Sequence, residues 1–354
     1  DSDPARVVIG KDTRRSSYML EYALAAGLVS SGADAYLLHV TTTPSVSYVA
    51  RTEGFDCGIM ISASHNPYYD NGIKLISGTG EKMDESTIAL IEDYLDGKLE
   101  AFGQTWQQLP LAQREHIGRT VDYVAGRNRY VGRLISLGMF SFKGMKVGLD
   151  CANGSAWTIA KSVFDALGAK TYVMGDEPDG YNINKNAGST HPEQLQAMVK
   201  ASGAVMGVAF DGDADRCLAV DEDGNMVNGD QIMGILARAK KNAGKLNHDT
   251  LVVTVMSNLG LKLALRSMGI KTVQTNVGDR YVLEEMLRGD YSLGGEQSGH
   301  VINREFATTG DGTLTALTLC NEVVKSGKSL KELAADFPQL PQTLINVPNV
   351  DKMA

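Results

Sequence analysis

The sequence alternates short apolar strands with helices, and this alternation restricts the fold more than any other feature. Three stretches repeat the same order of strand, polar turn, helix, glycine and second strand. Each glycine stands where a helix should end, which suits a left-handed C-terminal cap. We therefore predict an α/β protein with three successive similar domains, each built on a mixed sheet. The first strands of the repeats are Val7–Ile9, Lys146–Leu149 and Leu251–Thr254, and the glycines are Gly32, Gly168 and Gly269.

Breaks in this pattern give the domain boundaries. A charged helix over Thr120–Leu137 is expected to begin the second domain. The last stretch contains one strand-like run, Gln342–Val347, and we interpret it as a linker and the start of a further domain. Because the chain runs into a strand soon after Asp1, we expect that its natural start is missing. One strand cannot form a domain, so we also expect that most of a fourth, C-terminal domain is missing. The assigned segments are residues 1–117, 118–226, 227–337 and 338–354.

The charge balance limits the partners that such a chain can bind. Acidic residues number 42 and basic residues 34, for a net charge of −8. This argues against nucleic acid, whose phosphate backbone requires basic patches. No apolar run approaches the roughly 20 residues that span a bilayer, so no membrane partner is expected. The cysteines, three of them in or beside apolar runs, predict buried thiols and a cytoplasmic, reducing compartment. They are Cys57, Cys151, Cys217 and Cys320.

A serine-containing loop is the first candidate site. The apolar strand Cys57–Ile61 leads into Ser-Ala-Ser-His-Asn-Pro, residues 62–67. Small and polar residues before a proline predict a tight exposed loop with Ser64 at its apex, His65 beside it and Lys74 nearby. A simple hydroxyl-capped turn would have the same composition. The Gly-x-Ser-x-Gly elbow of esterases is absent, which argues against an acyl-transfer triad.

An acidic loop is the second candidate. The strand Val205–Phe210 runs into Asp211-Gly212-Asp213-Ala214-Asp215-Arg216, after which Cys217–Val220 resumes as a strand. Alternating carboxylates in a tight loop can converge on a hard cation such as Mg²⁺ or Ca²⁺. A calcium EF-hand is an alternative, with Glu222 at the twelfth position, but Arg216 occupies the sixth position, where that loop needs glycine. A solvated acidic turn neutralised by Arg216 is the other alternative.

Together these loops fit phosphoryl transfer. That chemistry needs an oxygen nucleophile, a divalent ion on the phosphate oxygens and cations that offset developing charge. The sequence contains no Gly-x-x-x-x-Gly-Lys-Ser/Thr loop and no kinase signature, so a nucleotide donor is not indicated. A protein without a nucleotide site could carry the phosphate on its own serine.

The same residues resemble the α-D-phosphohexomutase family. Residues 62–67 with Asp-Asn-Gly-Ile-Lys at 70–74 are similar to the active loop of that family, and residues 211–216 to its metal loop. Gly-Glu-Gln-Ser-Gly-His at 295–300 resembles its sugar-binding loop. The family usually has glycine where this chain has Ala214. A methyl group fits there unless the backbone requires a positive φ.

The resemblance implies a role for each matched residue. Ser64 would be the phosphoserine that donates a phosphoryl group to the sugar and recovers it. Mg²⁺ would be bound by Asp211, Asp213, Asp215 and an oxygen of the modified Ser64. Other roles implied are phosphoryl binding by Arg216; proton transfer by Lys74 or His65; sugar binding by Glu296 and Ser298; substrate contact or loop bracing by His300; and contact with the substrate or the active loop by Arg14 and Arg280.

Within the family, three further segments resemble the bacterial members that interconvert glucosamine 6-phosphate and glucosamine 1-phosphate, on the route to UDP-N-acetylglucosamine. These segments are residues 182–193, 277–282 and 308–312. The resemblance implies a bisphosphorylated sugar intermediate and allows a homodimer. A mutase for mannose or glucose phosphates is the alternative within the family. A non-catalytic phosphosugar-binding fragment is the alternative outside it, because the distal phosphate-binding domain is expected to be missing.

Overall fold

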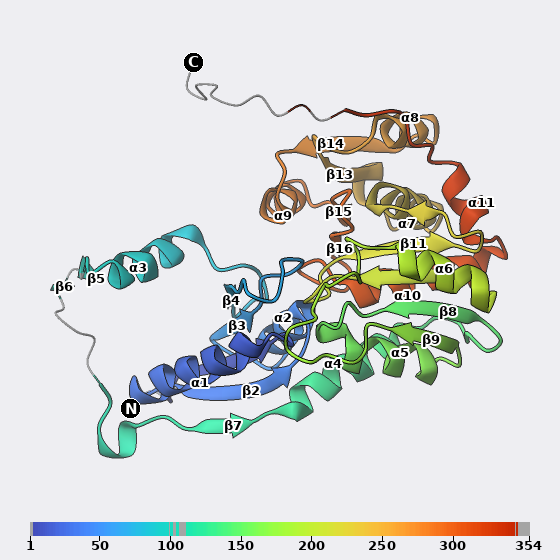
Figure 1. Ribbon diagram of the computed structural model, residues 1–354. Helices are drawn as coiled ribbons and strands as arrows, with labels where there is room; N and C mark the ends of the chain where they lie inside the picture. The colour runs from blue at the N-terminus through green and yellow to red at the C-terminus, as the bar shows by residue number, and fades with distance from the viewer. Residues whose placement is uncertain (1–2, 99, 102–103, 106–110, 344, 346–354) are drawn as a thin grey trace.

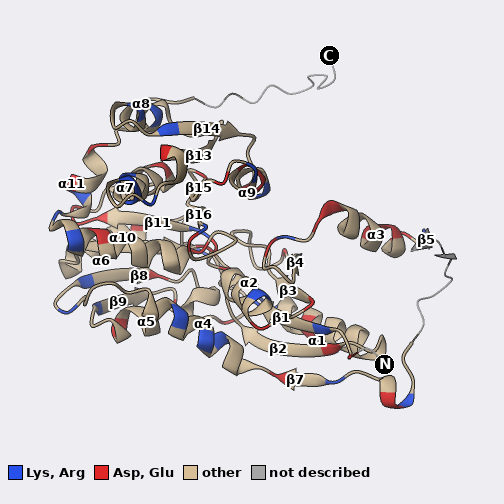
Figure 2. Cartoon of the chain, turned by 180° about the vertical axis from the view of Figure 1, so that it is seen from behind, with Lys and Arg blue, Asp and Glu red and all other residues tan. Residues whose placement is uncertain are grey.

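The computed structural model describes residues 3–98, 100–101, 104–105, 111–343 and 345, and it contains three α/β domains in succession (Figure 1). The predicted fold class is confirmed. In Figure 1 the second domain, green to yellow, lies beside the third, orange to red, and the first domain, blue, adjoins them. Figure 2 shows that acidic and basic residues are distributed over all three domains.

The first domain is built on a five-stranded sheet with the order β4-β3-β1-β2-β7. Its third helix and a small two-stranded ribbon, β5 and β6, extend away from this sheet (Figure 1). The elements are β1 Arg6–Lys11, α1 Arg15–Ser30, β2 Asp34–Val40, α2 Thr43–Thr52, β3 Cys57–Ile61, β4 Ile73–Ser77, α3 Glu85–Leu95, β5 Glu100–Ala101, β6 Gln104–Thr105 and β7 Thr120–Asp122.

The second domain has a sheet with the order β12-β11-β10-β8-β9. Its central strand, β10, is apolar and fully buried because helices cover both faces of the sheet. The elements are α4 Val124–Ser136, β8 Lys146–Asp150, α5 Ala160–Ala166, β9 Lys170–Met174, α6 Glu193–Ser202, β10 Met206–Phe210, β11 Cys217–Asp221 and β12 Met226–Val227.

The third domain has a four-stranded sheet with the order β14-β13-β15-β16. Asn228 begins its first helix with a capping box that it forms with Gln231. The elements are α7 Gly229–Asn242, β13 Thr250–Thr254, α8 Leu259–Ser267, β14 Lys271–Thr275, α9 Asp279–Arg288, β15 Leu293–Gly295, β16 Val301–Asn303, α10 Gly312–Ser326 and α11 Leu330–Ala335.

One strand arrangement recurs in all three sheets. The first strand of each domain (β1, β8 or β13) pairs in parallel with the second strand on one side and with the third on the other. The fourth strand (β4, β11 or β16) then pairs antiparallel with the third. The predicted repeat is thus confirmed. Each predicted capping glycine has a left-handed backbone, with φ of 92° at Gly32, 93° at Gly168 and 70° at Gly269.

The cores show how the domains are joined. One apolar cluster runs without a break through the second and third domains, from Phe142 and Phe210 to Phe337. Gly234 lets α7 lie directly against the ring of Phe337, because an added Cβ would be only 2.5 Å from that ring. The first domain has apolar clusters of its own, one on each face of its sheet. The second and third domains therefore form the more continuous body.

Two predictions about local structure are not confirmed: the start of the helix over residues 120–137 and the strand over residues 342–347. The expected helix over residues 120–137 is wrong at its start, because residues 120–122 form β7, which pairs in parallel with the free edge of β2. The helix begins at Val124. The first sheet thus extends past the predicted boundary at residue 117, and the domain boundaries stay predictions. Gln342 and Thr343 are not in a strand, and residues 344, 346 and 347 of that predicted run lie outside the described residues.

The described residues contain no helix that is both long enough and apolar enough to cross a membrane. Cys151, Cys217 and Cys320 are buried and Cys57 is partly exposed, and within the described chain all four thiols are free.

Candidate active site

The three motifs lie in structurally equivalent loops. In each domain the loop between the third and fourth strands carries one of them: residues 62–72, 211–216 and 296–300. The backbone amide of Cys217 donates to the carbonyl of Gly299 at 3.0 Å, which joins the second loop to the third. Ser64 Oγ donates to Asp211 Oδ2 at 2.5 Å, which joins the first loop to the second. The repeat thus brings the serine, the acidic cluster and the sugar-loop motif to one place.

The three aspartates form one buried cluster. Asp211, Asp213 and Asp215 each offer a carboxylate oxygen, and these oxygens lie within 4.8 Å of one another. Burial, followed by the charges of Asp215 and Asp213, holds the pKa of Asp211 well above its usual range. The flanking elements are strands β10 and β11, so the EF-hand alternative, which needs helices, is excluded.

Two oxygens of this cluster are available to a cation. Asp213 Oδ1 and Asp215 Oδ1 are buried and have no hydrogen-bond partner among the described residues. Buried polar atoms without partners are costly, and carboxylate oxygens are the ligands that hard divalent cations prefer. The donor set therefore fits such an ion. The loop turns tightly at Ala214, whose φ is 56°, so the position where the resembling family usually has glycine does require a left-handed backbone.

Lys74 contacts the other oxygens, Oδ2, of Asp213 and Asp215. Its ammonium group donates to Asp213 Oδ2 at 2.5 Å and to Asp215 Oδ2 at 3.3 Å. Burial alone would lower the pKa of Lys74, but the two carboxylates outweigh it and hold that pKa well above its ordinary value. The pKa of Asp215 is held well below its ordinary value, because Lys74 and the nearby His300 outweigh the opposing effect of burial. The lysine therefore neutralises part of the cluster, while the Oδ1 atoms of Asp213 and Asp215 accept no hydrogen bond from the described residues.

His65 and Arg216 lie beside the serine. His65 Nδ1 is 3.5 Å from Ser64 Oγ and 3.2 Å from Arg216 Nη1. Partial burial and the Arg216 charge lower the pKa of His65, so the ring tends to be neutral. Arg216 Nε is buried and has no partner within the described part of the chain. A guanidinium with an unused donor next to a hydroxyl is suited to binding a group attached to that hydroxyl.

Arg14 holds the backbone of the serine loop. It is fully buried and paired with the buried Asp12. Its Nη2 donates to the carbonyl of Ser64 at 3.2 Å and to that of Asn66 at 2.6 Å. The resemblance implied that Arg14 contacts either the substrate or the active loop, and the structure shows the contact with the active loop.

The sugar-loop residues have mixed surroundings. Glu296 is half-buried, and its Oε1 accepts from the amide of Gly278 at 2.9 Å. Ser298 is exposed, with its hydroxyl 3.5 Å from Glu296 Oε2. His300 is buried, accepts at Nε2 from the amide of Gly310 at 3.1 Å, and has Nδ1 at 3.8 Å from Asp215 Oδ1. His300 thus braces the acidic cluster and its own loop, whereas Ser298 is open to a ligand.

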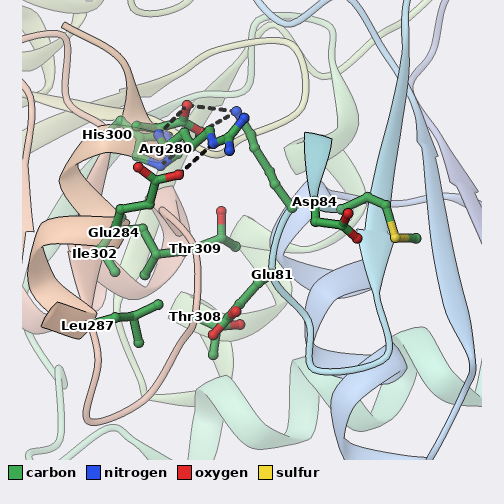
Figure 3. Close-up of a pocket in the computed structure, with 13 residues that line it drawn as sticks. Glu81, Asp84, Arg280, Glu284, Leu287, His300, Ile302, Thr308 and Thr309 are labelled. Carbon is green, nitrogen blue, oxygen red and sulfur yellow. Dashed lines mark hydrogen bonds and ion pairs between the residues drawn. The ribbon is translucent and has the colours of Figure 1, made fainter. Parts of the chain in front are cut away.

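Arg280 lies in a separate hollow between the first and third domains (Figure 3). This cavity of about 190 Å³ is also lined by Lys82, Asp279 and His300. Arg280 pairs with Glu85 of α3 and with Glu284, and within the described residues it makes no hydrogen bond to the serine loop. The contact with the active loop suggested for Arg280 is therefore not found, and a role in substrate binding stays a prediction.

The sequence analysis assigned no role to some residues that shape the site, although Asn184 and Asp279 stand in two of the segments that carry the resemblance. Thr43, at the start of α2, donates its hydroxyl to Asp213 Oδ2 and its amide to the Asp213 carbonyl. The run of threonines before Pro44 marks a helix start and could have drawn attention to this position. Asp279 pairs with Lys82 of the first domain at 2.6 Å and lies 3.8 Å from His300. Asn184, in the second domain, donates to the serine loop.

The repeated domains and the site at their meeting point define a phosphohexomutase fold. The chain belongs to the phosphoglucomutase/phosphomannomutase family: residues 2–101, 128–224 and 228–340 match the alpha/beta/alpha domains I, II and III of that family. It is 66% identical to a protein of Bifidobacterium adolescentis named phosphoglucosamine mutase, over 99% of this chain and 76% of that protein. A protein of Lachnospira eligens with the same name is 60% identical, over 98% of this chain and 76% of its own length.

A solved structure supports the assignment of the fold. The crystal structure of a phosphoglucomutase/phosphomannomutase family protein from Burkholderia thailandensis superimposes with a TM-score of 0.80 at 26% identity. The match covers 95% of this chain and 72% of that one.

Proposed function

We propose that this chain interconverts glucosamine 6-phosphate and glucosamine 1-phosphate, with Ser64 as the carrier of the phosphoryl group. The observation that carries the proposal is the contact of 2.5 Å between Ser64 Oγ and Asp211, in a cluster where two further carboxylate oxygens have no hydrogen-bond partner among the described residues. The choice of sugar is supported by relatives named phosphoglucosamine mutase that are 66% and 60% identical over nearly the whole chain.

Mg²⁺ is the proposed metal, with Asp211, Asp213, Asp215 and an oxygen of phosphorylated Ser64 as its ligands. When bound, Mg²⁺ would neutralise negative charge on the phosphoryl group during its transfer. The unpartnered Oδ1 atoms of Asp213 and Asp215 support this donor set. Lys74 holds the opposite oxygens of the same carboxylates and so orients them.

In the first half-reaction the bond between phosphorus and Ser64 Oγ breaks, and a bond from phosphorus to a sugar hydroxyl oxygen forms. The proton of that hydroxyl leaves to a base, and Ser64 Oγ ends as a hydroxyl. The second half-reaction reverses these steps with the other phosphate of the bisphosphorylated sugar. His65 is suited to accept the proton, since its pKa is lowered and its Nδ1 lies 3.5 Å from Ser64 Oγ. Lys74 is the second candidate for proton transfer, and its raised pKa makes it a weak acid while it is paired with Asp213 and Asp215.

The remaining residues bind the substrate in this proposal. Arg216 Nε, buried and unpartnered in the described chain, donates to phosphoryl oxygens. Glu296 and Ser298 hydrogen-bond to sugar hydroxyls, a kind of contact that discriminates strongly because an analogue leaves it unmade. Arg280, at the edge of the cavity in Figure 3, adds a cation for the phosphorylated substrate.

The experiment measures phosphoryl uptake and turnover separately. The chain is incubated with glucose 1,6-bisphosphate and Mg²⁺, and intact mass is expected to rise by about 80 Da, the mass of one phosphoryl group. Peptide mapping should place it on Ser64, and Ser64→Ala should show neither uptake nor turnover. Ser86→Ala, which changes an exposed serine in α3, is the matched control and should behave as wild type.

The outcomes separate the alternatives. Uptake on another residue, or turnover by Ser64→Ala, would exclude the proposal. Uptake on Ser64 without turnover of any hexose phosphate would favour the phosphosugar-binding alternative. Turnover that is faster with mannose or glucose phosphates than with glucosamine 6-phosphate, compared as kcat/KM, would favour the alternative within the family.

A further inference from the structure

The side-chain amide of Asn184 donates to two carbonyls of the serine loop. Its Nδ2 lies 2.9 Å from the oxygen of Ser64 and 3.0 Å from that of Asn66. Arg14 donates to the same two oxygens from the first domain, at 3.2 Å and 2.6 Å. Both carbonyls are therefore held twice, once from each of two domains. Carbonyl oxygens have two lone pairs, so this arrangement satisfies them fully.

The loop needs such support because its backbone is strained at the nucleophile. Ser64 has φ of 52°, in the left-handed region. A residue with a Cβ costs about 1–2 kcal/mol in that region, so it persists only when its surroundings impose it. This backbone conformation sets the direction of the Cα–Cβ bond of Ser64, from which the hydroxyl reaches Asp211. Contacts that fix the Ser64 carbonyl consequently keep Cβ where the hydroxyl can make that contact.

Asn184 is itself held rigidly. It is only 7% exposed, and its backbone amide donates to the carbonyl of Ala152 at 2.8 Å. Gly212 of the acidic loop lies against both partners: an added Cβ would collide with the Ser64 carbonyl oxygen and would come within 3.1 Å of Asn184 Nδ2. The serine loop, the acidic loop and the Asn184 amide thus meet in a space that admits no additional methyl group.

We infer that Asn184 is a positioning residue, which aims the Ser64 hydroxyl at the acidic cluster and keeps it aimed while the phosphoryl group leaves and returns. The inference rests on the proposed function, since it assigns Asn184 a part in each half-reaction. Asn184 touches the loop backbone rather than the reacting oxygen. Its loss should therefore slow the chemical step without weakening the binding of sugar, because small misplacements of reacting groups are costly for rate.

Two substitutions separate the amide from the backbone of Asn184. Asn184 has φ of 58°, which glycine and aspartate also adopt readily. Asn184→Gly keeps this conformation and removes the amide, and Asn184→Asp replaces the donor with a charge that repels both carbonyls. Asn186→Gly is the matched control, because Asn186 has φ of 52° in the same loop but is exposed, and its side chain makes no hydrogen bond within the described residues.

The readouts are the rate at which glucose 1,6-bisphosphate phosphorylates Ser64, followed by intact mass, and the kcat and KM for glucosamine 6-phosphate. Asn184→Gly should slow both the phosphorylation and kcat at least about tenfold, as expected for lost transition-state positioning, and Asn184→Asp should slow them further. KM should change less than about twofold. Asn186→Gly should match wild type.

The outcomes distinguish this inference from the function on which it rests. If wild-type protein takes up no phosphoryl group on Ser64, the proposed function fails. If wild type is phosphorylated and Asn184→Gly and Asn184→Asp are phosphorylated as fast as Asn186→Gly, the positioning role of Asn184 is wrong. A rise in KM at unchanged kcat in Asn184→Gly would likewise overturn it, because that result would indicate a substrate contact.

Discussion

The ammonium group of Lys74 lies 2.5 Å from Asp213 Oδ2, across the contact between the first and second domains. Lys74 comes from β4, the antiparallel strand that follows the serine loop, and Asp213 from the acidic loop. The pair therefore joins the two loops independently of the contact between Ser64 and Asp211. The lysine acts as an internal counter-ion for carboxylates that would otherwise repel one another.

Lys74→Met should make the fold depend more strongly on Mg²⁺. Without the ammonium group, Asp213 loses its ion-pair partner and Asp215 keeps, among the described residues, only the more distant His300, at 3.8 Å. Because the Lys74 side chain is 25% exposed, the destabilisation in EDTA should stay near about 3 kcal/mol, the low end for a broken buried pair. Added Mg²⁺ would restore the missing positive charge. Thermal unfolding in EDTA and in Mg²⁺ should thus show a larger Mg²⁺-induced rise in Tm for Lys74→Met than for wild type.

Lys82→Met is the control for this experiment. Lys82 also pairs with an aspartate of another domain, Asp279, but that side chain is 24% exposed and is not one of the three carboxylates of the cluster. Its substitution should leave the Mg²⁺-induced rise in Tm as in wild type. Equal rises in wild type and Lys74→Met would contradict the role of Lys74 as a counter-ion for the cluster.

Gly212→Ala should separate the serine loop from the acidic loop. The new methyl group would collide with the Ser64 carbonyl oxygen. Moving the serine loop away would break the hydrogen bonds from Asn184, and moving Gly212 would break the one that its carbonyl accepts from the Ser155 amide at 2.8 Å. We expect phosphorylation of Ser64 to slow by at least about a hundredfold and stability to fall by about 1–3 kcal/mol, as in overpacked interiors. Intact mass after incubation with glucose 1,6-bisphosphate measures the first effect, and urea unfolding the second.

Gly27→Ala is a matched change with the opposite expectation. Gly27 lies on the exposed side of α1, and an added Cβ would meet no described atom within 4 Å. Alanine is favoured over glycine inside a helix by about 0.5–1 kcal/mol, so this variant should gain that much stability and keep wild-type phosphorylation. If Gly212→Ala were as stable and as readily phosphorylated as Gly27→Ala, the tight meeting of the two loops would be wrong.

Much of the site could be predicted because its chemistry occurs in short runs of sequence. The serine loop, the acidic loop and the sugar loop each hold their functional side chains within about six neighbouring residues, next to recognisable strands. Asn184 stands in the segment 182–193 that carries the resemblance, but nothing in that segment indicated its role. It acts on carbonyl oxygens of residues 64 and 66, 120 and 118 positions away, and a contact between a side chain and a distant backbone leaves no pattern in either segment.

The errors arose where tertiary contacts decide the local structure. Residues 120–122 form a strand because β2 offers a free edge, and helical periodicity in the following residues concealed it. The contact with the active loop that was suggested for Arg280 is not found, because Arg280 instead pairs with Glu85, a contact that depends on how the first and third domains meet. That placement is set by packing between domains, which strand and helix patterns do not specify.

Tyr130→Phe should weaken the contact between the second and third domains. The Tyr130 hydroxyl, in α4, donates to Asp311 Oδ2 at 2.7 Å, and both side chains are buried. Phenylalanine leaves the ring packing intact but removes one donor from a buried carboxylate. The free energy of unfolding should fall by about 1.5–3 kcal/mol, as expected for a hydrogen bond to a charged group. Urea unfolding at pH 7 measures this loss, and a change below about 0.5 kcal/mol would contradict it.

Asp311 should also make stability depend on pH. Burial raises the pKa of its carboxyl from an ordinary 3.8 to about 6, although hydrogen bonds from Leu314 and Tyr130 oppose the shift. A folded-state pKa above the unfolded one means that the stabilisation is fully present below about pH 3.8 and is lost as pH rises through about 6. The size of the shift corresponds to about 3 kcal/mol.

Asp311→Asn isolates this effect, because asparagine cannot ionise yet still accepts from the amide of Leu314 at the start of α10. Other carboxylates titrate in both proteins, so the difference in unfolding free energy between wild type and variant reports on Asp311 alone. Measured by urea unfolding at intervals between pH 4 and 7.5, wild type should lose about 2.4 kcal/mol relative to the variant as pH rises, since part of the full effect is already lost at pH 4. If the difference in unfolding free energy stays constant, or if wild type becomes relatively more stable as pH rises, the pKa of Asp311 is not raised in the folded protein.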